Sequence, residues 1–88
     1  MKVKEGFMLR EIAGSWVVVP LGARVVEFNG LISLTETSAF IWRLLEQGHS
    51  TDEILKRVLS EYDIDEETAR KDMDEFIQCG IEKGLFIA

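Results

Sequence analysis

The residue types that most often carry out catalysis are scarce in this sequence. The 88 residues include one cysteine, Cys79, and one histidine, His49. A nucleophilic cysteine needs a base positioned beside it, and a structural zinc site needs about four ligands, mostly cysteine and histidine. The sequence offers neither arrangement, and it contains no glycine-rich phosphate-binding loop. We therefore expect no enzymatic activity, no bound metal and no cofactor.

The charged residues are unevenly distributed along the chain. The formal net charge is −6. Residues 1–34 contain four basic and three acidic residues, whereas residues 35–88 contain six basic and thirteen acidic residues. The second part therefore has a formal charge of −7 and repels polyanions, which argues against nucleic acid as the partner.

Composition places the chain among folded proteins. Its hydrophobic content of 47% and charged content of 30% are ordinary for a globular domain, and 88 residues predict one domain, residues 1–88. No apolar run approaches the ~18 residues of a membrane span, and the N-terminus has no signal-peptide core. A single cysteine cannot form an internal disulfide, which fits a cytoplasmic location.

Residues 7–34 are predicted to form a small antiparallel sheet of three or four strands. The run Trp16–Val19 is aromatic and β-branched, and Pro20 ends it because proline cannot donate to a ladder. Ala13–Ser15 is a turn signal. Asn29-Gly30 is the strongest hairpin signal, because a type I′ turn needs positive φ at both central residues.

A very apolar helix is predicted after these strands. Thr35 can cap its N-terminus, and Gly48 can end it. At about 100° per residue its apolar side chains cover roughly 200° of the helix surface. They are Phe40, Ile41, Trp42, Leu44 and Leu45. A helix this apolar must be covered on two sides, so we expect it to be the central helix.

Two further helices follow. Ser50 and Glu53 form a capping box that begins an amphipathic helix. Asp65 can cap the last helix, which is predicted over Glu66–Lys83 with Gly84 as its end. Strands followed by three helices with short connections predict an α+β, winged-helix-like fold.

Short segments along nearly the whole chain share a recognisable pattern. They are Val18–Gly22, Phe28–Gly30, Leu34–Thr37, Phe40–Trp42, Leu44–Glu46, Asp72, Phe76–Ile77 and Gly84–Leu85. This pattern resembles the PqqD family, pyrroloquinoline quinone synthesis protein D. The resemblance implies a RiPP recognition element, a non-catalytic peptide chaperone. Such a module binds the leader of a ribosomally made precursor peptide and presents it to a modifying enzyme, often a radical SAM enzyme.

The resemblance also implies where the leader peptide binds. In the family the leader adds as a strand beside the third strand and packs against the third helix, which here correspond to Arg24–Leu34 and Glu66–Lys83. The hairpin signal leaves open whether residues 24–28 or 31–34 form the outer edge. The implied peptide-binding residues are Val25, Val26, Glu27, Phe28, Leu31, Ile32, Ser33, Arg70, Met73, Phe76, Ile77 and Gly80.

The sequence departs from the family pattern at two positions. Thr35 stands where asparagine is usual, and it can still cap a helix. Gly80 stands where the family tends to have leucine, on the apolar face of the last helix. A glycine there could leave a notch for a side chain of the bound peptide. It could instead allow close packing against another element of the same chain, or lie where the end of the helix frays.

Other candidates on the last helix also have two interpretations. Arg70 could pair with Asp74 at helical spacing or with an acidic residue of a leader peptide. Met73, Phe76 and Ile77 recur at helical spacing, which is typical of a core and also fits the wall of a cleft.

Two alternatives to leader binding follow from the same pattern. The first is a winged-helix DNA-binding protein, with the last helix as its recognition helix. Residues 66–83 carry six acidic and three basic residues, which disfavours contact with phosphates. The second is a homodimer joined strand to strand, which would occupy the edge that a leader peptide needs.

Overall fold

The computed structural model describes residues 1–22 and 32–87. The predicted Asn29-Gly30 hairpin lies outside the described residues, as do the candidates Val25, Val26, Glu27, Phe28 and Leu31. The elements are β1 (Lys2–Val3), β2 (Phe7–Ile12), β3 (Ser15–Pro20), β4 (Ile32–Leu34), α2 (Glu36–Glu46), α3 (Thr51–Glu61), α4 (Glu66–Glu82) and β5 (Phe86–Ile87).

Strands β2, β3 and β4 form an antiparallel sheet in that order. Ile12 pairs with Ser15, so Ala13 and Gly14 make a two-residue hairpin. Both turn residues have positive φ, 52° and 82°, as a type I′ turn requires. On the far side of β3, Val17 pairs with Ser33 of β4. The turn predicted at Ala13–Ser15 is therefore confirmed.

One face of this sheet packs on the core. Because side chains alternate across a strand, the paired residues Leu9, Val18 and Ile32 share a face. All three belong to the main hydrophobic cluster or pack against it. The opposite face carries Met8 and Ile12, which are 40% and 50% exposed. The sheet thus has one buried face and one that exposes large apolar side chains.

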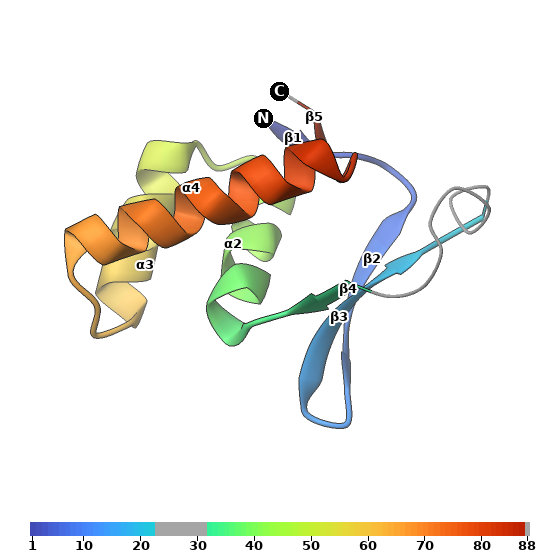
Figure 1. The fold of residues 1–88 in the computed structure, drawn as a ribbon, viewed down its shortest axis with the longest axis horizontal. Helices are drawn as coiled ribbons and strands as arrows, with labels where there is room; N and C mark the ends of the chain where they lie inside the picture. The colour runs from blue at the N-terminus through green and yellow to red at the C-terminus, as the bar shows by residue number, and fades with distance from the viewer. Residues whose placement is uncertain (23–31, 88) are drawn as a thin grey trace.

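Helix α2 occupies the centre of the fold, as predicted (Figure 1). The hydroxyl of Thr35 accepts a hydrogen bond of 3.1 Å from the backbone N–H of Ser38, which caps the helix. Gly48 follows the last turn at φ 88°. Trp42 is fully buried, and α2 contacts β1, β4, α3 and α4. The wide apolar arc is therefore covered by separate elements on different sides.

The two remaining helices also begin where the sequence places them. The Ser50 hydroxyl accepts from the backbone N–H of Glu53, and the Glu53 carboxylate accepts from the backbone N–H of Ser50, both at 3.2 Å. This is the predicted capping box. Asp65 caps α4 by accepting from the backbone N–H of Thr68 at 3.0 Å.

The two ends of the chain form a short ladder that the sequence pattern did not predict. Strands β1 and β5 are antiparallel, with Lys2 opposite Ile87. The N–H of Lys4 donates to the carbonyl of Leu85 at 2.8 Å. Figure 1 shows both termini together at one end of α4. Two-residue strands carry too little alternation to be recognised from sequence.

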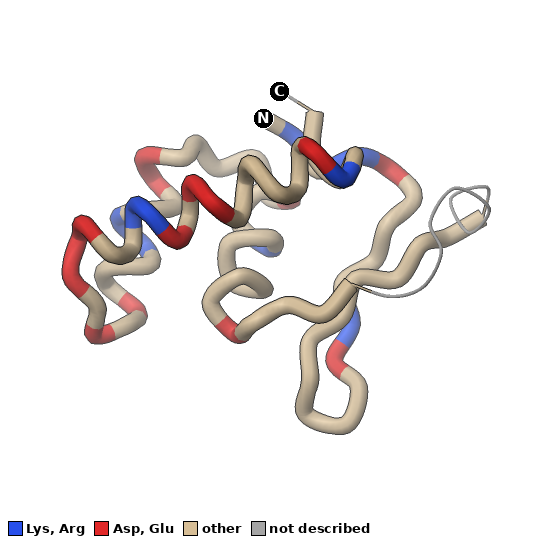
Figure 2. The backbone as a smooth tube through the Cα atoms, viewed as in Figure 1, with Lys and Arg blue, Asp and Glu red and all other residues tan. Residues whose placement is uncertain are grey.

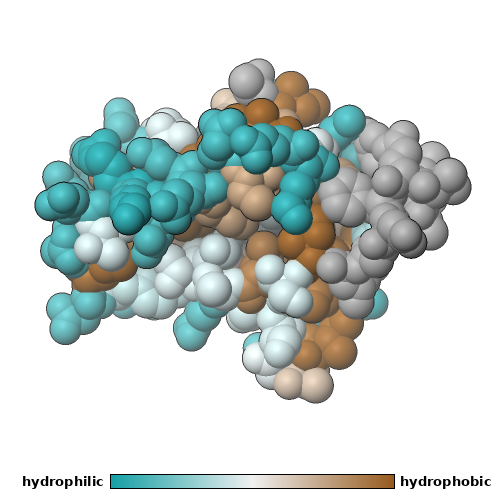
Figure 3. Space-filling view, viewed as in Figure 1, coloured by the Kyte–Doolittle hydropathy of each residue, from teal (hydrophilic) through white to brown (hydrophobic). Residues whose placement is uncertain are grey.

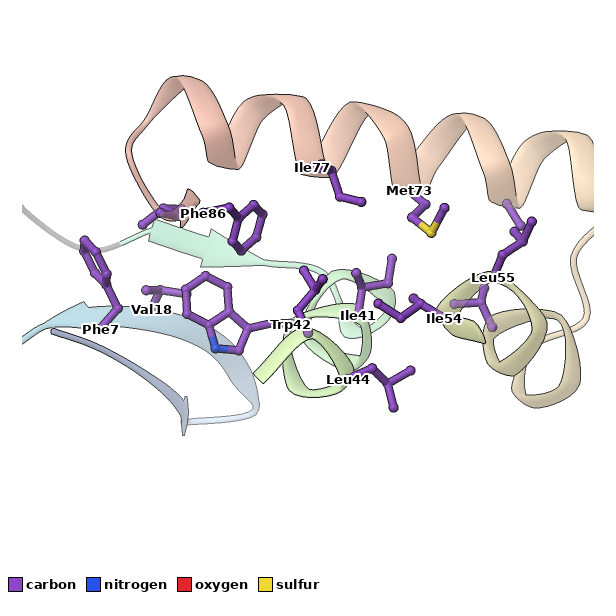
Figure 4. Packing of buried hydrophobic residues seen from close by; sticks show 14 residues of the cluster. Phe7, Val18, Ile41, Trp42, Leu44, Ile54, Leu55, Met73, Ile77 and Phe86 are labelled. Carbon is purple, nitrogen blue, oxygen red and sulfur yellow. The ribbon is translucent and has the colours of Figure 1, made fainter. Parts of the chain in front are cut away.

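The aromatic ring of Phe86 in β5 enters the core (Figure 4). Its centroid lies 5.4 Å from that of Trp42 and 5.5 Å from that of Phe76. The ring also covers Gly80, where an added Cβ would overlap its Cε2 and Cδ2 atoms. The notch interpretation of Gly80 is therefore wrong, because the protein's own phenylalanine fills that space. The close-packing interpretation is the correct one.

We predict that Gly80→Ala will destabilise the protein. The new methyl group must displace a buried ring, and overpacking of this kind costs about 1–3 kcal/mol. The gain in helix propensity of about 0.5–1 kcal/mol offsets only part of this cost. Urea unfolding will measure the change, with Cys79→Ala as the control at an exposed neighbouring position.

Relief of the clash identifies its cause. In the double variant Gly80→Ala/Phe86→Leu, the smaller leucine side chain makes room for the added methyl group. The double variant will therefore lose less stability than the sum of the losses of the two single variants. Fully additive costs would contradict a direct contact between the two positions.

We also predict that Asp65 contributes to acid sensitivity. Hydrogen bonds from the backbone N–H and the hydroxyl of Thr68 lower the pKa of Asp65 from its ordinary value of 3.8. A lowered pKa in the folded state adds stability above pH 3.8 that is lost as the pH falls through the folded-state pKa.

Asp65→Asn keeps a capping oxygen but removes this titration. Its free energy of unfolding, measured in urea over a series of pH values, will therefore fall less steeply with acid than that of the wild type. Asp74→Asn is the matched control, because it changes the net charge equally at a position that does not cap a helix. The same acid profile for Asp65→Asn and the wild type would contradict this role.

Candidate peptide-binding groove

The described part of the sheet ends at β4. Strand β4 pairs with β3 on one side, and no other described strand adjoins it. Among the described residues, the backbone hydrogen bonds of turns, loops and caps involve none of Ile32, Ser33 or Leu34. Such a strand presents N–H and C=O groups that an extended peptide can satisfy.

A groove lies at the junction between the end of β4 and the start of α2. It has a volume of about 520 Å³, and it runs between the first turns of α2 and the middle of α4. Its lining residues are Thr35, Thr37, Ser38, Ile41, Asp72, Glu75, Phe76 and Cys79. Thr35 directly follows Leu34, so the strand edge and the groove are continuous along the chain. Figure 3 shows apolar surface between the polar side chains of α4 and the sheet.

The α4 wall of the groove is one stripe of the helix. Asp72, Glu75, Phe76 and Cys79 follow the spacing i, i+3, i+4, i+7, which places them on one face. The α2 wall consists of its N-cap and first two turns. Thr35 donates its hydroxyl to Ser38 at 3.0 Å, so these two side chains hydrogen bond to each other. Phe76 and Ile41 supply the apolar part of the lining.

The structure separates the predicted helix residues into different environments. Met73 and Ile77 are 4% and 9% exposed and point into the core (Figure 4). Gly80 is buried beneath Phe86. Only Phe76 among the candidates on α4 both packs against the core and lines the groove. The core interpretation therefore applies to most of this stripe.

Arg70 lies outside the groove lining. Its guanidinium is 3.9 Å from the carboxylate of Glu66, one turn earlier, rather than beside Asp74. Both side chains are more than half exposed. The expected helical ion pair exists, but with the other acidic neighbour.

Sequence reasoning missed most of the groove. It did not select Thr37, Ser38, Asp72 or Glu75 as binding residues, nor did it select Cys79. The Cys79 thiol is exposed. The only sequence feature that could have indicated the groove was the polar stripe next to Phe76 on α4, which contains Asp72 and Glu75. That stripe could not be interpreted as a groove wall without knowing which element faces it.

A second hollow lies on the other side of β4. It has a volume of about 470 Å³ and borders Trp16, Leu34 and Arg43. Trp16 is half-buried, with the guanidinium of Arg43 4.8 Å from its ring centroid. This cation–π contact occupies the exposed face of the indole ring.

The charge of the helices restricts what this surface can bind. Figure 2 shows acidic residues along α4, with fewer basic residues between them. No lysine or arginine lines the groove. Among the described residues no three metal-ligating side chains are grouped, and no helix there is long and apolar enough to cross a membrane. The charge of this surface therefore disfavours anionic ligands.

The chain resembles solved structures and a known protein family. No curated protein matches the chain. The solved structure described as TbiB1 in complex with the TbiA(beta) leader peptide is 26% identical and superposes with a TM-score of 0.77, covering 97% of this chain and 93% of that one.

A second solved structure, lasso peptide synthetase B1 complexed with the leader peptide, is 20% identical. Its TM-score is 0.79, over 99% of this chain and 96% of that one. At this identity the likeness demonstrates the fold alone. The family model of coenzyme PQQ synthesis protein D (PqqD) matches residues 15–85. Since this match spans most of the sequence, the chain belongs to the PqqD family.

Proposed function

We propose that this protein is a non-catalytic module that binds the leader segment of a ribosomally made precursor peptide. The leader adds as a strand to β4 and places a side chain in the groove. The protein then presents the precursor to a modifying enzyme. The observation that carries this proposal is a strand edge, β4, that continues into a groove between α2 and α4.

The edge of β4 supplies affinity that does not depend on sequence. Each backbone hydrogen bond to a guest strand contributes a net stabilisation of about 0.5–1.5 kcal/mol. Strand β4 has three residues, so the described edge can form only a few such bonds. Side chains of the guest must therefore supply the rest of the affinity and the selectivity.

The groove supplies those side-chain contacts. Phe76 is half-buried, and its ring packs edge-to-face against the ring of Phe86. This contact restricts the ring, which presents an aromatic surface to the groove. Burying an apolar side chain against such a surface contributes about 25 cal/mol per Å² of apolar area removed from water. A rigid wall also reduces the entropy lost on binding.

The comparisons support the same proposal. The TbiB1 structure, at 26% identity, contains a leader peptide. The modifying enzyme is proposed to be a radical SAM enzyme, as the resemblance to PqqD implies. The cluster of acidic residues on α4 argues against the DNA-binding alternative, because a recognition helix must approach phosphates.

We predict that peptides selected from a random display library on the immobilised protein will bind at this site. In amide-shift titrations the largest changes will fall on Ile32–Leu34, Thr37, Ser38 and Phe76. N-methylation of the peptide at alternate positions will abolish binding in one register and leave it nearly unchanged in the other, because only every second N–H of a strand points to a given neighbour.

Variants of α4 will test the groove wall. Phe76→Ala will weaken binding by about tenfold through lost apolar contact. Ile81→Ala is the matched control, because Ile81 is exposed on the same helix outside the groove. Bound peptide will also slow the reaction of the Cys79 thiol with Ellman's reagent. If no selected peptide perturbs β4 or the groove, or if both variants bind equally well, leader binding at this site is wrong.

A dimer joined through β4 has a different signature. The shifts of Ile32–Leu34 would then depend on protein concentration in the absence of peptide, and the sedimentation coefficient would rise with concentration. Either result would show that the edge is occupied by a second copy.

A further inference from the structure

The groove carries two carboxylates that have no partner within the described part of the chain. Asp72 and Glu75 lie on its α4 wall and are exposed. Among the described residues, Arg70 forms an ion pair with Glu66, and His49 lies 3.6 Å from the carboxylate of Glu53. Neither Asp72 nor Glu75 accepts a side-chain hydrogen bond from another described residue.

These two carboxylates also repel each other. They are three residues apart on one helix face, a spacing at which like charges destabilise the helix. The opposite wall is formed by Thr35, Thr37 and Ser38, which are uncharged. The apolar part of the groove, Phe76 and Ile41, is thus flanked by unbalanced negative charge on one side only.

From this arrangement we propose that the groove selects a leader segment with a lysine or arginine two residues away from an apolar anchor residue. This inference rests on the proposed function, and it specifies the chemistry of the guest. The apolar side chain packs on Phe76 and Ile41. The basic side chain reaches Asp72 and Glu75 and relieves their repulsion.

The spacing follows from the two backbones. Alternate side chains of an extended strand point to the same face and are about 6.6–6.8 Å apart. Asp72 and Phe76 are four residues apart, which is about 6 Å along a helix axis. A guest strand that follows α4 therefore places its anchor at Phe76 and its cation at the carboxylates when the two residues are at positions i and i+2.

The net charge of −6 adds a long-range contribution. An acidic surface attracts a cationic peptide before contact and raises the association rate, and salt screens this effect. The local pairing and the long-range attraction make separate predictions. Local pairing depends on which carboxylates are present, whereas long-range attraction depends mainly on the total charge.

Two double variants separate these contributions. Asp72→Asn/Glu75→Gln removes the carboxylates of the groove. Glu67→Gln/Asp74→Asn removes two carboxylates of the same helix outside the groove and changes the net charge equally. The probe is a peptide enriched from the random display library on the wild-type protein, together with its analogue in which the basic residue is replaced by glutamine.

For the wild type at low salt, we expect the glutamine analogue to bind about fivefold more weakly, the size expected for a partly exposed ion pair. The groove variant will reduce this difference to less than about twofold. The control variant will keep it near fivefold. The enriched peptides will contain lysine or arginine two residues from an apolar residue.

The other outcomes are decisive. Peptides that bind at β4 and the groove without an enriched basic residue, or an equal loss of preference in both double variants, would overturn the charge selection and leave leader binding intact. Failure of every peptide to perturb the groove resonances would overturn both proposals.

Discussion

Phe86 joins parts of the fold that lie far apart in the sequence. Its ring fills the space above Gly80, contacts the buried Trp42 and supports Phe76 from behind. The same residue belongs to β5, which pairs with β1. The side chain of Phe86 therefore packs α4 against α2, while its backbone joins the last strand to the first. Close packing around the ring makes the positions of these elements depend on one another.

The groove is a consequence of this packing. Helix α4 directs Met73 and Ile77 into the core, while the neighbouring stripe with Asp72 and Glu75 faces the start of α2. Phe76 lies between the two stripes and takes part in both. In the proposed binding mode, a residue at this boundary contributes both to stability and to binding, so changes there affect both properties.

The sheet and the helices have separate tasks in the proposed binding. The edge of β4 can hold any extended chain, because backbone groups are the same in every residue. The groove restricts that choice through its apolar floor and its acidic wall. This division suits the proposed role, in which a flexible leader is held while the rest of the precursor stays free. A winged-helix-like fold is compatible with both peptide binding and DNA binding. The negative charge of α4 disfavours DNA binding.

The sequence by itself determined the local structure. Thr35, the Ser50–Glu53 capping box and Asp65 begin their helices where predicted, because a cap depends only on residues within one turn. The breadth of the apolar arc on α2 likewise predicted its central position. Only the tertiary structure decided what Gly80 contacts, which side of Phe76 is covered, and which charges face an open groove. Those properties depend on Phe86 and the first turns of α2 meeting α4 in space, and no pattern within a single segment records that contact.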